Sequence, residues 1–128
     1  MLPLEVRLAA LNGKHFIYLT HAGYILSRAV PSNITDFVWN RNHWYWRGED
    51  LGGDVMVCGH TPVDALINDF EALDISYELK DGCLFHGGKI NIDIGACRYN
   101  KTVLLNIDTL EIKTFTLTED DVNDAQDK

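Results

Sequence analysis

The first half of the chain contains two short apolar runs, Phe-Ile-Tyr-Leu at 16–19 and Val-Met-Val-Cys at 55–58. Their length and their polar or glycine-containing flanks predict buried β-strands rather than helices. A histidine follows each run, His21 in Thr-His-Ala-Gly and His60 in Gly-His-Thr-Pro. Because ligands gather at the C-terminal ends of strands in open sheets, these two loops are the first candidate site.

Helical patterns are fewer. Apolar residues recur at helical spacing from residue 63 to residue 73, and we expect a helix with Thr61 as its N-cap and Pro62 as its first residue. Residues 5–11 have a helix-forming composition that ends at Asn12-Gly13. A further helix entry is expected at 31–33, before a segment that holds all three tryptophans.

From residue 75 onward the pattern is that of β-strands. Apolar residues alternate at 75–79 before an Asp81-Gly82 turn, alternate again at 90–94, and flank a turn near 108–109. Residues 118–128 are acidic and lack apolar periodicity, so we expect a disordered tail after a single domain at 1–117. Together these elements predict an α+β or α/β fold with a mixed β-sheet.

Charge and composition exclude several classes of partner. The chain of 128 residues has a formal net charge of −8, and its 11 basic residues are scattered, which argues against nucleic acid. No apolar run is long enough to span a membrane. The three cysteines have no CxxC spacing, so free thiols in a cytoplasmic protein are expected.

Arg41 lies between the two histidine loops in the sequence. A guanidinium group matches a phosphate in fork geometry and keeps its charge, and imidazole is a good ligand for a divalent transition metal. Each residue also has a simpler interpretation: a turn position for His21 or His60, and stacking on Trp39 or Trp44 for Arg41. Of the other histidines, we expect His15 to be exposed, His43 to pack among aromatic side chains, and His86 to lie at a turn.

Four motifs occur in a distinctive order: His-Ala-Gly at 21–23, Trp-Asn-Arg at 39–41, Gly-His-Thr-Pro-Val at 59–63 and Ile-Asp-Ile-Gly-Ala at 92–96. This order and spacing resemble the C-terminal half of the calcineurin-like metallophosphoesterases, most closely the bacterial and phage-type serine/threonine phosphoprotein phosphatases. The resemblance implies part of the metallophosphoesterase sandwich, a mixed sheet with helices. Ile94 and Arg-Tyr-Asn at 98–100 depart from the family's pattern and leave the subfamily open.

The resemblance also implies roles for single residues. His21 and His60 would ligate one metal of a dinuclear manganese, iron or zinc centre, Arg41 would bind the substrate phosphate, and Asp93 would orient the site structurally. The implied activity is hydrolysis of phosphomonoesters, in a phosphoprotein or a small phosphoester, by a metal-activated hydroxide. Dinucleotide polyphosphate hydrolases share similar histidine and arginine motifs and are an alternative.

The motifs of the family's N-terminal half, Gly-Asp-x-His-Gly, Gly-Asp-x-x-Asp-Arg-Gly and Gly-Asn-His-Glu, do not occur in the sequence. In the family they supply the other metal ligands, a second phosphate-binding arginine and the general acid. The resemblance therefore implies half of an active site, inactive alone and without an identifiable general acid. We expect the chain to pair with a missing N-terminal half, to self-associate, or to fold with an exposed apolar sheet face. A non-catalytic remnant or interaction module is the alternative from another class.

Overall fold

The computed structural model describes residues 5–23, 34–45 and 51–118. The helix entry expected at 31–33 and nearly all of the expected tail lie outside these residues. No helix in the described ranges is long and apolar enough to cross a membrane.

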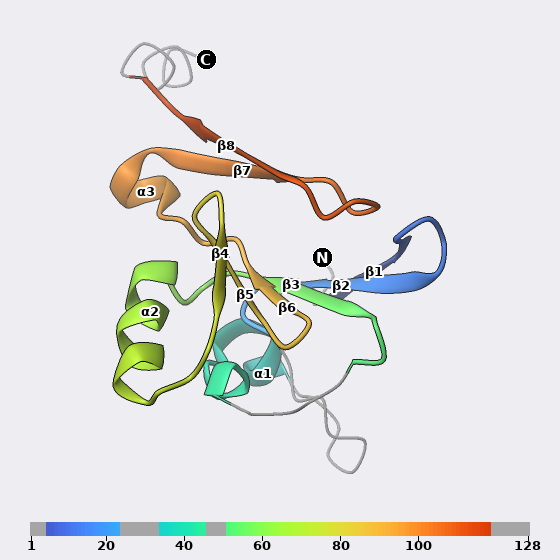
Figure 1. Ribbon diagram of the computed structural model, residues 1–128, viewed down its shortest axis with the longest axis horizontal. Helices are drawn as coiled ribbons and strands as arrows, with labels where there is room; N and C mark the ends of the chain where they lie inside the picture. The colour runs from blue at the N-terminus through green and yellow to red at the C-terminus, as the bar shows by residue number, and fades with distance from the viewer. Residues whose placement is uncertain (1–4, 24–33, 46–50, 119–128) are drawn as a thin grey trace.

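The structure is mixed α+β, and its main element is a six-stranded mixed sheet (Figure 1). Strands β2, β3 and β6 run parallel to one another, whereas the outer strands pair antiparallel. In spatial order the strands are β1 (Glu5–Ala10), β2 (His15–Thr20), β3 (Val55–Cys58), β6 (Lys89–Asn91), β5 (Cys83–His86) and β4 (Glu78–Lys80). Both apolar runs of the first half are therefore central strands, as predicted.

Residues 5–10 form strand β1, so the helix predicted at 5–11 is wrong. Leu11, Asn12 and Gly13 all have positive φ and turn the chain back, so that β1 pairs with β2 from Glu5↔Thr20 to Ala10↔His15. The backbone hydrogen bonds of this hairpin outweigh the helix propensity of the segment, because intrinsic propensity amounts to only about 0.7 kcal/mol per residue.

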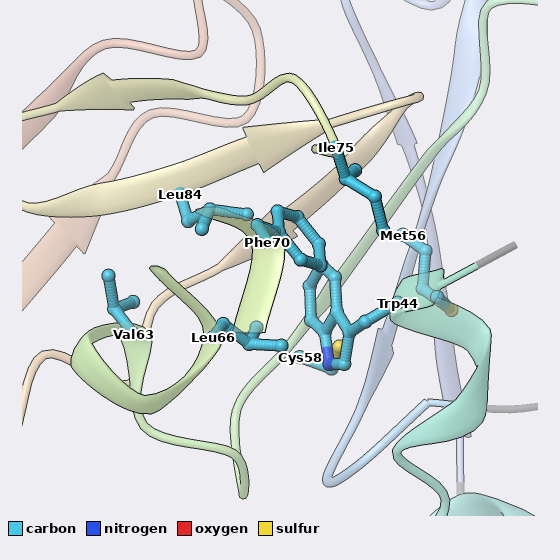
Figure 2. Close-up of a cluster of buried hydrophobic side chains, with 8 residues drawn as sticks. All are labelled: Trp44, Met56, Cys58, Val63, Leu66, Phe70, Ile75 and Leu84. Carbon is cyan, nitrogen blue, oxygen red and sulfur yellow. The ribbon is translucent and has the colours of Figure 1, made fainter. Parts of the chain in front are cut away.

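One face of the sheet packs against helix α2 (Val63–Ala72) and the short helix η1 (Asn42–Tyr45) (Figure 1). Figure 2 shows this cluster, in which the Trp44 side chain comes from η1 and the Phe70 side chain from α2. Its buried members are Trp44, Met56, Cys58, Val63, Leu66, Phe70, Ile75 and Leu84. Helix α1 (Ile34–Trp39) lies on the same side of the sheet.

The predicted cap of α2 is displaced by one residue. Pro62 occupies the N-cap position and makes no side-chain cap hydrogen bond, so the assignment of Thr61 as cap is wrong. The Thr61 amide donates to the Gly59 carbonyl at 2.8 Å, and the Thr61 carbonyl accepts from Asn91 Nδ2 at 2.6 Å. These bonds hold Thr61 in the preceding loop, and the helix begins at Val63.

The opposite face of the sheet is covered by the hairpin β7 (Lys101–Leu105) and β8 (Ile112–Thr116), which follows the short helix α3 (Ala96–Tyr99) (Figure 1). Leu105, Ile107 and Leu110 of this hairpin pack on a second core cluster. The buried members of that cluster are Ala10, Ile17, Val55, Val57 and Ile90. The molecule thus has a helical layer, the main sheet, and a smaller two-stranded sheet.

Candidate functional site

The site lies where the three parallel strands end. His21 directly follows β2, Gly59 and His60 follow β3, and Asp93 lies two residues beyond β6. Because parallel neighbours point the same way, their C-terminal ends share one edge of the sheet. The topology therefore brings three of the four predicted site residues to one edge.

The two histidines are in direct contact. Nε2 of His21 lies 3.2 Å from Nδ1 of His60, and the ring centroids are 5.0 Å apart with 57° between the planes. His21 is exposed, and His60 is partly buried. The structure therefore places one ring nitrogen of each loop histidine within hydrogen-bonding distance of the other.

Backbone contacts hold the two loops together. The Gly59 amide donates to the His21 carbonyl at 2.9 Å, and a β-carbon at residue 59 would meet Cβ of Asp93 at 3.5 Å. His60 has φ +66°, a left-handed conformation that is uncommon for histidine. A conformation of this kind persists only where surrounding contacts enforce it, and it often marks a functional loop.

Asp93 is held by a buried amide. Asn91 is fully buried, and its Oδ1 accepts from the Asp93 backbone amide at 2.9 Å while its Nδ2 donates to the Thr61 carbonyl at 2.6 Å. The Asp93 carbonyl in turn accepts from the amide of Val63 at 3.0 Å. This connection fixes the loop after His60 against the end of β6. The sequence had singled out Asp93 but contained no signal for Asn91.

Trp39, the last residue of α1, and Arg41, between α1 and η1, border the pair. Arg41 is exposed, and its positive charge acts on His60. The Trp39 indole meets the His60 ring edge to face, with centroids 5.2 Å apart, although 67 % of Trp39 is exposed. An indole this exposed is available to a ligand as well as to the imidazole.

The surroundings of His60 favour the neutral ring. Burial of the imidazole is the main cause that lowers its pKa from the usual value, and the charges of Arg41 and His21 lower it further. Asp93 acts in the opposite direction. A neutral imidazole is the form that ligates a metal ion.

The donor set fits one divalent cation. Two imidazole nitrogens bound at about 2.0–2.1 Å to one tetrahedral ion lie roughly 3.3 Å apart, which agrees with the observed 3.2 Å. Nε2 of His60 is buried and has no hydrogen-bond partner among the described residues. In the described part of the chain, however, no group of three His, Cys, Asp or Glu residues could hold a metal ion. A hydrogen bond between two neutral rings accounts for the same distance.

A cavity of about 430 Å³ adjoins the site through Asp93. It lies between α2 and the hairpin β7–β8, and its walls include Val63, Ile67, Ile94 and Tyr99. The Tyr99 hydroxyl donates to Oδ2 of Asp64 at 2.9 Å across one side of this cavity.

His43 was expected to be a packing residue, and it is fully buried. It also contacts the backbone of the His21 loop, which the sequence did not reveal. Its neighbours in the sequence are aromatic, and that pattern indicates burial without indicating a partner.

No family model, no curated protein and no solved structure matches this chain. The chemistry of the site therefore rests on its own residues.

Proposed function

We propose that this chain carries half of a metal-dependent phosphoesterase site of the serine/threonine phosphatase type. His21 and His60 bind one divalent cation, and Arg41 binds the phosphate of a phosphomonoester. A bound cation would supply positive charge and lower the pKa of coordinated water. The observation that carries this proposal is the 3.2 Å distance between the two loop nitrogens at the end of parallel strands.

The chain's own residues contribute binding and orientation. The guanidinium of Arg41 can hold phosphate oxygens in its fork, and it disfavours protonation of His60. Asp93 limits this effect and helps to position the loop. In this proposal the general acid and the remaining metal ligands are supplied by another polypeptide, because the family's three N-terminal motifs do not occur in the sequence.

Manganese binding tests the ligand assignment. Isothermal titration of the full chain with Mn²⁺ should give a single weak site, and His60→Ala should abolish it. His86→Ala is the control, because His86 is a histidine of β5, outside the loops of His21 and His60, and its ring bonds the Ser76 carbonyl at 2.9 Å. Absence of binding by the wild-type chain contradicts the proposal.

Turnover tests the phosphoesterase assignment. The chain with Mn²⁺ alone should not hydrolyse p-nitrophenyl phosphate. Addition of a polypeptide carrying the family's three N-terminal motifs should produce hydrolysis that Arg41→Ala reduces. A panel that includes a phosphopeptide and a dinucleotide polyphosphate then separates the two hydrolase alternatives.

The second candidate is a non-catalytic interaction module. It is favoured by one observation, the lack of a third metal-binding side chain beside His21 and His60 in the described ranges. Manganese binding without turnover in the complemented assay would support this candidate over the phosphoesterase.

A further inference from the structure

The side chain of His43 contacts the two residues that directly follow His21. His43 lies on η1 and is fully buried. Its Nε2 lies 2.6 Å from the Ala22 carbonyl oxygen, and since a carbonyl only accepts, the proton is on Nε2. Its Nδ1 is buried and has no hydrogen-bond partner among the described residues. The bond to Ala22 is thus the ring's one polar contact in the described part of the chain.

Gly23 gives a second contact that is independent of this hydrogen bond. Its φ is +126°, and a β-carbon there would lie 2.3 Å from Nε2 of His43. Only a residue without a β-carbon lets the imidazole approach the backbone this closely. The ring therefore fills the space beneath the loop and leaves its backbone little freedom to move inward.

His43 is itself held by the sheet. Nζ of Lys89, a residue of β6 that is 2 % exposed, donates to the His43 carbonyl. The His43 ring also packs on Trp44 with centroids 4.6 Å apart. A chain of contacts thus runs from β6 through His43 to Ala22, the residue next to His21.

We infer that His43 is a positioning residue that fixes the loop of His21, and so sets the distance between the imidazoles of His21 and His60. The expected effect of His43 on metal binding rests on the proposed function. Its geometry can be tested without metal.

Burial, and to a lesser extent the charge of Lys89, lowers the pKa of His43 to about 4 despite the bond to Ala22, so the ring is neutral near neutral pH.

Two substitutions of similar volume separate hydrogen bonding from packing. His43→Gln keeps an N–H group that can reach the Ala22 carbonyl, whereas His43→Leu has none. Loss of a partner that orients a metal ligand typically lowers metal affinity by 10- to 100-fold. We therefore expect His43→Leu to lower Mn²⁺ affinity by roughly 10-fold or more, whereas His43→Gln should retain most of the wild-type affinity. The control variant His86→Leu, on β5, should bind Mn²⁺ with the wild-type affinity.

Nuclear magnetic resonance of the histidine ring nitrogens provides the metal-free measurement. In the wild-type chain the His43 ring should be the Nε2–H tautomer, and a Nδ1–H tautomer overturns the inference. In His43→Leu the ring signals of His21 and His60 should shift, with smaller shifts in His43→Gln. Wild-type ring signals and wild-type Mn²⁺ affinity in a folded His43→Leu chain also overturn it. If the wild-type chain binds no Mn²⁺, the proposed function fails while the ring signals still decide the role of His43.

Discussion

The hydroxyl of Tyr45 donates to Oδ2 of Asp69 at 2.8 Å, which ties η1 to the outer side of α2. Two further tyrosines bond α2 carboxylates in the same way from other elements. These pairs are Tyr77 with Glu71 at 3.0 Å and Tyr99 with Asp64 at 2.9 Å. One helix therefore receives a phenol from η1, from the segment before β4, and from α3.

The phenol of Tyr99 should titrate later than a free tyrosine. Its hydrogen bond to Asp64 is the main cause that raises its pKa, because ionisation removes that bond and leaves two negative groups in contact. Asp64→Asn should lower the pKa of Tyr99, measured by ultraviolet absorbance against pH. Asp74→Asn, at an exposed position after α2, is the control. An unchanged titration in Asp64→Asn would contradict the assignment.

The burial of His43 should make stability depend on pH in the acid range. The folded-state pKa is about 4, against 6.5 for the free side chain. Above pH 6.5 the ring is neutral in both states. As the pH falls from there, the unfolded chain takes up a proton that the folded chain does not, so the free energy of unfolding decreases until about pH 4.

This contribution amounts to about 3 kcal/mol at the acid end of the range. Urea unfolding of the wild type and of His43→Gln, near neutral pH and near pH 4, measures it. The variant should lose less stability on acidification, by an amount of that order. Equal losses of stability in both proteins would mean that folding does not lower the pKa of His43.

Substitution of Gly23 should destabilise the fold strongly. In Gly23→Ala the new β-carbon would overlap the His43 ring, in addition to the cost of φ +126°. We expect a loss of about 2–4 kcal/mol in the free energy of unfolding, measured with urea. Gly13→Ala is the control for backbone strain alone, because residue 13 also has positive φ but has no atom within 4 Å of the built β-carbon. Similar losses in both variants would rule out the steric contact.

Phe70 should contribute most of the stability that α2 provides. Its ring is fully buried and packs near the rings of Tyr45 and His86, at centroid distances of 6.1 and 5.1 Å. Phe70→Ala should lower the free energy of unfolding by about 3–5 kcal/mol, because it removes apolar contact and leaves a cavity. Leu73→Ala at the end of the same helix, where the side chain is 53 % exposed, should cost less than about 1 kcal/mol. Comparable losses in the free energy of unfolding for Phe70→Ala and Leu73→Ala would mean that Phe70 is not a core residue.

Patterns with a strong local cause were predicted correctly. The run at 55–58 is β3 to the residue, since four adjacent buried apolar side chains suit a central parallel strand. The turn at Asp81 and Gly82 also follows from local chemistry, because both residues have positive φ between β4 and β5. The proximity of His21 and His60 was predicted correctly, because each follows such a strand and their ring nitrogens lie 3.2 Å apart.

Features that depend on distant partners were not predictable. The Asn12-Gly13 dipeptide suits the end of a helix, but it is also a strong short signal for a hairpin, and the partner strand β2 decides between the two. Lys89 is buried in β6, where the sequence alone favours exposure of a lysine. The contact of His43 with Ala22 depends on how η1 packs, which no local pattern encodes.

The parallel pairing of β2 with β3 also determines when the histidine pair can form. His21 and His60 are 39 residues apart in the sequence, so a loop of that length must close before their rings can meet. Contacts of such long sequence separation form slowly, since the intervening loop must close before they contribute stability. We therefore expect the two rings to meet late in folding, so that contact between them marks completion of the pairing of β2 with β3.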